Sequence, residues 1–107
     1  MSDKITYLTA ENFESQLAGG RPAVIDFYAD WCGPCQMLDP VINELAEKYS
    51  DTVNFCKINI DQQKKLAVTN QVLSIPTILF IKNGREVERI TGALPLPAME
   101  EKVKGLL

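Results

Sequence analysis

The sequence predicts one α/β domain with a mixed, mostly five-stranded central sheet and about four helices packed on both faces. Apolar runs of strand length alternate with amphipathic stretches in the order βαβαβ, followed by αββα. The run at residues 23–29 is nearly all apolar, which is typical of a central strand covered on both faces. A length of 107 residues suits one domain, so we expect a single domain over residues 1–107.

The first elements are an edge strand, a helix and the central strand. Residues 5–8 form a weak candidate for the edge strand. Thr9 offers an N-cap for a helix at residues 10–18, and two glycines at positions 19 and 20 end it. Asp26 is the exception within the apolar run that follows.

A long helix is expected from Gly33 to Tyr49, because apolar residues recur through this stretch with the helical period. Pro34 lies in the first turn, where a missing backbone N–H costs little. Pro40 lies in the interior, where it should remove one backbone hydrogen bond and kink the helix.

The second half of the chain should add three strands and two helices. The strands are expected at residues 53–60, 77–82 and 85–91, and the helices at residues 64–70 and 97–105. Asn83 and Gly84 separate two strand-like runs, and this dipeptide is suited to a tight hairpin. The hairpin should therefore add an antiparallel edge to the parallel part of the sheet.

Composition narrows the classes of partner and compartment. A net charge of -3 and a pI near 4.9 argue against general binding to nucleic acid or to anionic membranes, which need basic patches. The N-terminus shows no apolar signal region, and no apolar run approaches the ~20 residues of a membrane-spanning helix. We therefore expect a cytoplasmic protein, unless a targeting segment has been removed. A monomer is also expected.

The cysteine and histidine counts exclude several chemistries. The three cysteines are an odd number, which does not suit a disulfide-stapled secreted domain. The chain has no histidine, so no mechanism can use a histidine base. Cys56 alternates with apolar residues in its strand and is expected to be a small buried hydrophobe.

Cys32 and Cys35 lie where the central strand gives way to the long helix, in the motif Trp-Cys-Gly-Pro-Cys. At this spacing the two sulfurs share a helix face and can form a disulfide. Free N–H groups and partial positive charge at the helix N-terminus favour a reactive thiolate. A zinc site is the alternative, but it needs about four ligands and only Cys56 and carboxylates remain.

Over its whole length the chain resembles the thioredoxin family. The matching stretches are residues 24–28, 31–35, 40, 57–61, 75–77, 82–84 and 92–94. The resemblance implies the thioredoxin fold and a protein-disulfide reductase, a general electron donor to protein disulfides. It implies a redox-active disulfide between Cys32, an exposed nucleophile that forms a mixed disulfide, and Cys35, a buried thiol that resolves it.

Proton transfer from Cys35 needs a base, and Asp26 is the best candidate. Burial among apolar residues should raise the pKa of Asp26 and make it a base near neutral pH. Lys57 is the only charged residue in the strand expected at residues 53–60 and could lie beside Asp26. The resemblance assigns this pair the proton-transfer role.

The resemblance also implies a cis bond before Pro76 and an apolar docking surface around Cys32. The surface would consist of Trp31, Gly33, Pro34, Ile75, Pro76, Gly92 and Ala93. The backbone of Ile75 would pair with an extended substrate segment. The expected partners are disulfide-containing proteins and a separate thioredoxin reductase that supplies electrons from NADPH. We expect neither a bound cofactor nor a metal.

Two other functions fit parts of this pattern. A thiol oxidant or isomerase on the same fold often has histidine between its cysteines, whereas this chain has Gly33 and Pro34, which favours a reductase. A non-catalytic binding module would use the apolar surface and would tolerate loss of both cysteines. The chain departs from the family pattern at Tyr28, at Gln36 and in the leucine–proline stretch at residues 94–97.

Overall fold

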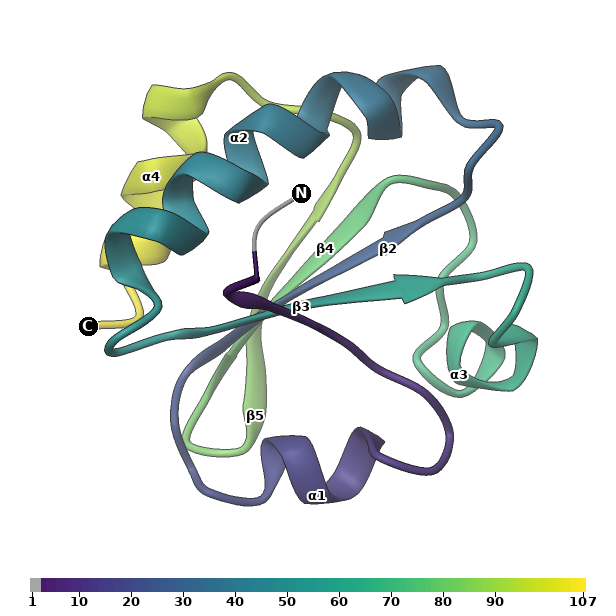
Figure 1. The fold of residues 1–107 in the computed structure, drawn as a ribbon, viewed down its shortest axis with the longest axis horizontal. Helices are drawn as coiled ribbons and strands as arrows, with labels where there is room; N and C mark the ends of the chain where they lie inside the picture. Colours follow the sequence, from purple (N-terminus) through teal and green to yellow (C-terminus); the bar gives the residue numbers. More distant parts are fainter. Residues whose placement is uncertain (1–2) are drawn as a thin grey trace.

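The computed structural model describes residues 3–107, which form a five-stranded sheet and four helices. This architecture confirms the predicted fold class. The elements follow one another as in Figure 1: β1 Ile5–Tyr7, α1 Phe13–Leu17, β2 Ala23–Tyr28, α2 Gly33–Tyr49, β3 Asn54–Asn59, α3 Lys64–Thr69, β4 Thr77–Lys82, β5 Arg85–Thr91 and α4 Leu96–Lys104.

The strand order is β1-β3-β2-β4-β5, so β2 lies at the centre of the sheet. The three strands β1, β3 and β2 are parallel to one another. β4 is antiparallel to β2, and β5 is antiparallel to β4. The predicted hairpin therefore forms the antiparallel edge.

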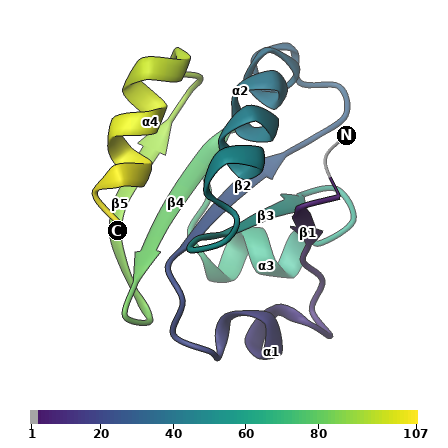
Figure 2. The same cartoon turned by 60° about the vertical axis from the view of Figure 1, so that its left-hand side comes forward.

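The helices cover both faces of the sheet. Figure 2 shows α2 and α4 on one side and α1 and α3 on the other. Side chains alternate between these faces along each strand. In β2, Val24 packs into the cluster under α2 and α4, whereas Ile25 and Phe27 pack into the opposite cluster. Asp26 thus projects towards the face that α2 covers.

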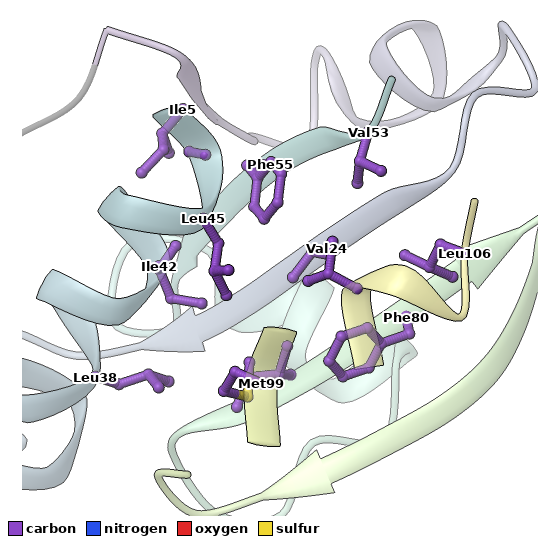
Figure 3. Packing of buried hydrophobic residues seen from close by; sticks show 13 residues of the cluster. Ile5, Val24, Leu38, Ile42, Leu45, Val53, Phe55, Phe80, Met99 and Leu106 are labelled. Carbon is purple, nitrogen blue, oxygen red and sulfur yellow. The ribbon is translucent and has the colours of Figure 1, made fainter. Parts of the chain in front are cut away.

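The larger core cluster lies between the sheet and the helices α2 and α4 (Figure 3). α2 contributes Leu38, Ile42 and Leu45, while α4 contributes Met99 and Val103. Phe55 and Phe80 reach this cluster from β3 and β4 (Figure 3). This packing fixes α2 against the sheet and so positions the start of α2, where the cysteine motif lies.

The N-terminal helix is shorter than predicted. The sequence predicted a helix at residues 10–18 with Thr9 as N-cap, but α1 covers only Phe13–Leu17 and its N-cap is Asn12. Thr9 and Asn12 bond to each other instead: the Thr9 N–H donates to Asn12 Oδ1 at 2.7 Å, and the Asn12 N–H donates to Thr9 Oγ1 at 3.3 Å. These bonds hold residues 9–12 in a turn ahead of the helix.

Most other predicted bounds agree within one residue. α2, β4 and β5 match the prediction, and α2 continues through Pro40. The leucine–proline stretch also has a structural reason. Pro95 is the N-cap of α4, and Leu94 and Leu96 pack against the larger core cluster. Within residues 3–107, no helix is long and apolar enough to cross a membrane.

The β4–β5 hairpin depends on a positive φ at two consecutive residues. Asn83 has φ 55° and Gly84 has φ 76°. We expect Gly84→Ala to lower the free energy of unfolding by about 1 kcal/mol, because alanine is strained at positive φ. No atom lies within 4 Å of an added Cβ at Gly84 or at Gly19, and Gly19 has no positive φ. Urea denaturation should therefore show a loss for Gly84→Ala and none for the control Gly19→Ala.

Candidate active site

The cysteine pair forms a disulfide at the N-terminus of α2, where the chain leaves β2 (Figure 1). The two Cα atoms are 5.2 Å apart. Cys32 is the N-cap of the helix with an extended backbone, and its Sγ accepts a hydrogen bond from the Cys35 N–H at 3.2 Å. Pro34 lies in the first turn, as its lack of an N–H allows. The helix N-terminus therefore directs a backbone donor at Cys32 Sγ.

The expectation that Cys32 is exposed is wrong for this disulfide form. Cys32 is 4% exposed and Cys35 is 2% exposed. The cause is packing, since the pair and Ala29 form a small cluster against Tyr28, Ile60 and Ile75. The residues next to Cys32 in the chain are accessible to solvent, since Trp31, Gly33 and Pro34 are all exposed. The accessible surface beside the disulfide therefore comes from these neighbours, and Cys32 itself contributes only a small accessible part.

Asp26 is fully buried, at 0% exposure. Within residues 3–107, no group hydrogen-bonds to either carboxylate oxygen of Asp26. Burial is the main cause that raises the pKa of Asp26 from 3.8 to about 7. The negative charge of Asp39 also raises this pKa, whereas the positive charge of Lys57 lowers it. The group can therefore gain or lose a proton near neutral pH, which is what a base for a thiol requires.

Lys57 is the register partner of Asp26 in the parallel pair β2–β3, as the sequence suggested. Its Nζ does not bond to Asp26, however, but forms an ion pair with Asp39 Oδ1 of α2. The ammonium also lies 4.5 Å from the centre of the Tyr28 ring. Burial disfavours the charged form of Lys57, but the carboxylates of Asp39 and Asp26 outweigh it and raise its pKa.

Asp39 was not among the residues singled out from the sequence. It lies four residues after Cys35, and residues at this spacing share one face of a helix. That spacing was the available signal, but a carboxylate on a long helix is usually only solvated. Its contact with Lys57 depends on how α2 lies across β3.

The cis Ile75–Pro76 bond lies beside the end of β5. The bond before Pro76 is cis, as the resemblance implied. The Gly92 N–H donates to the Pro76 carbonyl at 2.8 Å, next to the paired residues Thr77 and Thr91. Ala93 follows and is exposed. Ile75 packs against the cysteine cluster, so this loop borders the disulfide.

Trp31 is 69% exposed, and its indole Nε1 donates to Asp61 Oδ2 at 2.8 Å. The indole borders a groove of about 340 Å³. The groove is lined by Trp31, Ile60, Val72, Leu73, Ser74 and Ile75. Sequence reasoning missed Ile60, Val72 and Leu73 as possible docking residues. Leu73 is 97% exposed, and an apolar residue outside the expected strands and helices was the available signal.

Cys56 lies in the cluster on the opposite face of the sheet from Asp26, with Ile58 and Phe27. It is 2% exposed, and burial raises the pKa of its thiol to about 12. Such a thiol is almost wholly protonated at neutral pH and is a poor nucleophile. Within residues 3–107, no group of three or more cysteine, aspartate or glutamate side chains is placed to hold a metal ion.

A sheet with helices on both faces, and a disulfide at a helix N-terminus, together define a thiol–disulfide exchange protein. The family model for thioredoxin matches residues 4–105. The chain belongs to the thioredoxin family. It acts as a protein-disulfide reductase, and its Cys32–Cys35 pair is the redox-active disulfide.

Named relatives agree with this assignment. The chain is 37% identical to "Thioredoxin" of Alicyclobacillus acidocaldarius over 94% of its own length and 95% of that protein. It is 40% identical to "Thioredoxin 2" of Chlorobaculum tepidum, over 96% of this chain and 95% of that one. It is 42% identical to "Thioredoxin M-type, chloroplastic" of Pisum sativum, over 85% of this chain and 53% of the relative, so it spans about half of that protein.

Proposed function

We propose that Cys32 is the nucleophile of the reductase and Cys35 the resolving thiol. The observation that carries this assignment is the position of Cys32 at the N-cap of α2, where its sulfur accepts the Cys35 N–H. In the reduced protein the Cys32 thiolate attacks one substrate sulfur, the substrate S–S bond breaks, and the other substrate sulfur leaves as a thiolate, which takes a proton from water. A mixed disulfide remains between Cys32 and the substrate.

Cys35 completes the exchange. Its thiol loses a proton, its sulfur attacks Cys32 Sγ, and the bond between Cys32 and the substrate breaks. The second substrate sulfur leaves as a thiolate, which takes a proton from water, and the Cys32–Cys35 disulfide is formed again. Asp26 accepts the Cys35 proton in this proposal, since its pKa of about 7 suits exchange near neutral pH. Lys57 stabilises the ionised form of Asp26 by its charge.

In this proposal the docking surface consists of the exposed Trp31, Gly33, Pro34 and Ala93 together with the partly buried Ile75 and Gly92. Pro76, which was also expected in this surface, is buried. Within residues 3–107, no group hydrogen-bonds to the backbone N–H or C=O of Ile75. An extended substrate segment can therefore pair with Ile75 through its own backbone, as a strand pairs with a sheet edge. This pairing would hold the substrate disulfide over Cys32.

The reductase needs a source of electrons, because each turnover leaves Cys32 and Cys35 oxidised. We assign this role to a separate thioredoxin reductase that draws on NADPH. In this proposal residues 1–107 act as one thioredoxin domain and as a monomer. The protein would act in the cytoplasm, transfer electrons to protein disulfides and maintain the cellular redox balance.

Reduction of insulin in the presence of NADPH and a thioredoxin reductase tests this proposal. We expect the unaltered protein to give continuous NADPH consumption and Cys32→Ser to give essentially none, because serine cannot form the attacking thiolate. Cys56→Ser is the matched control and should retain activity, since Cys56 lies in the opposite cluster.

Two results would contradict the assignment. If Cys32→Ser retained turnover, Cys32 would not be the nucleophile. If the unaltered protein gave no turnover with a competent reductase, the chain would be a binding module on the thioredoxin fold.

A further inference from the structure

Asp39 is a partly exposed carboxylate that is bonded to the buried Lys57, the register partner of Asp26. Its side chain is 45% exposed, whereas the Lys57 side chain to which it is bonded is 6% exposed. Asp39 follows Cys35 by one helical turn, so both residues lie on the same stripe of α2. From this stripe Asp39 contacts Lys57 of β3. Asp26, Lys57 and Asp39 therefore form a group of three charged residues, in which Asp39 lies at the solvent-facing end of Lys57.

The strand register alone does not explain why Asp26 lacks a hydrogen-bond partner. Asp26 and Lys57 are register partners with side chains on the same face of the sheet, so their charges interact. The Lys57 ammonium nevertheless bonds to Asp39 and lies over the Tyr28 ring. Both carboxylate oxygens of Asp26 remain without a partner in the described part of the chain.

The surroundings of Asp26 contain few other ionisable groups. β3 contributes Lys57, and α2 contributes Asp39. Tyr28 of β2 and Tyr7 of β1 interact with Lys57. The residue opposite Asp26 in β4 is the apolar Ile78. Lys57 and Asp39 are thus the charges that act on Asp26.

We propose that Asp39 is a positioning residue, which holds the Lys57 ammonium at its surface end and so keeps the Asp26 carboxyl unpaired and able to take the Cys35 proton. This inference rests on the proposed role of Asp26 as the base. If Asp39 loses its charge, Lys57 is free to bond to Asp26 directly. A directly bonded carboxylate is a weaker base, because its ionised form is then held by the ammonium.

Removal of the Asp39 charge has two effects on Asp26, and both have the same sign. The negative charge of Asp39 itself raises the pKa of Asp26, so its loss lowers that pKa. Release of Lys57 brings a positive charge closer to Asp26 and lowers it further. The Asp26 titration in Asp39→Asn should therefore shift towards acid by at least about half a pH unit.

Carboxyl-carbon NMR of the titrating Asp26 measures this shift. Asp39→Asn should lower the Asp26 midpoint, and Asp39→Glu should restore it at least in part. Glu44→Gln is the matched control, since it removes an exposed carboxylate from the same helix and should leave the midpoint in place.

The kinetic readout is resolution of a mixed disulfide between Cys32 and thionitrobenzoate. Attack by Cys35 forms the Cys32–Cys35 disulfide and releases the coloured thiolate. In Asp39→Asn the midpoint of the rate against pH should move towards acid together with the Asp26 midpoint. In the double variant Asp26→Asn/Asp39→Asn the rate should match that of Asp26→Asn alone.

The outcomes separate the two proposals. An Asp26 midpoint that is unchanged in a folded Asp39→Asn variant, or that shifts equally in Glu44→Gln, would overturn the role of Asp39. If Asp26→Asn alone left the pH profile unchanged, Asp26 would not be the base, and the reductase activity itself would stand.

Discussion

Cys35→Ser should convert the transient mixed disulfide into a stable covalent complex. The Cys32 thiolate can still attack a substrate disulfide, but the serine hydroxyl cannot displace the substrate from Cys32. We expect essentially complete loss of multiple turnover in the insulin assay. We also expect a substrate–protein adduct that survives denaturing electrophoresis without reductant and disappears when reductant is added.

The pair of single variants makes this prediction specific. Cys32→Ser should lose turnover without accumulating the adduct, because the attacking sulfur is absent. Cys35→Ser in a Cys56→Ser background should still form it, which excludes capture by Cys56. If Cys32→Ser formed the adduct and Cys35→Ser did not, the two cysteines would have the opposite roles.

Asp26→Asn should make the oxidised protein more stable at high pH. The folded-state pKa is about 7 and the ordinary value is 3.8, so between these values the folded chain holds a proton that the unfolded chain releases. Stability therefore falls as pH rises through this window and stays low above about pH 7. The difference between the two pKa values corresponds to about 4 kcal/mol, which is an upper bound on the gain from asparagine.

Urea denaturation at two pH values tests this linkage. The gain of Asp26→Asn should be largest at about pH 8.5 and should largely disappear near pH 4, where the carboxyl is protonated in the folded chain. Asp51→Asn removes an exposed carboxylate and should change stability little at either pH. A loss of stability in Asp26→Asn at high pH would show that ionised Asp26 stabilises the fold.

The same substitution should slow resolution of the mixed disulfide. Asparagine cannot accept the Cys35 proton, so hydroxide or water must do so, and we expect a loss of about 10²-fold or more at neutral pH. The variant is thus expected to be more stable and less active. Together, the stability and kinetic measurements test whether the unpaired carboxyl is kept for catalysis at a cost to the fold.

Local chemistry explains why some elements could be predicted to the residue. The hairpin at Asn83 and Gly84 needs positive φ at both positions, and these are the residue types that tolerate it. The helix α2 carries its apolar period over 17 residues and begins at a proline-containing first turn. The helix α1 was predicted too long because Thr9 and Asn12 bond to each other, and propensity alone does not show that competition.

For this protein, the sequence by itself determined the fold class, the bounds of its strongest elements and the identity of the reactive cysteines. Those features depend on local periodicity and on a motif of five consecutive residues. Tertiary structure decided which groups surround Asp26, how little of Cys32 is exposed, and that Lys57 bonds to Asp39. These contacts join residues from β2, β3 and α2, and only strand register and helix packing bring such distant residues together.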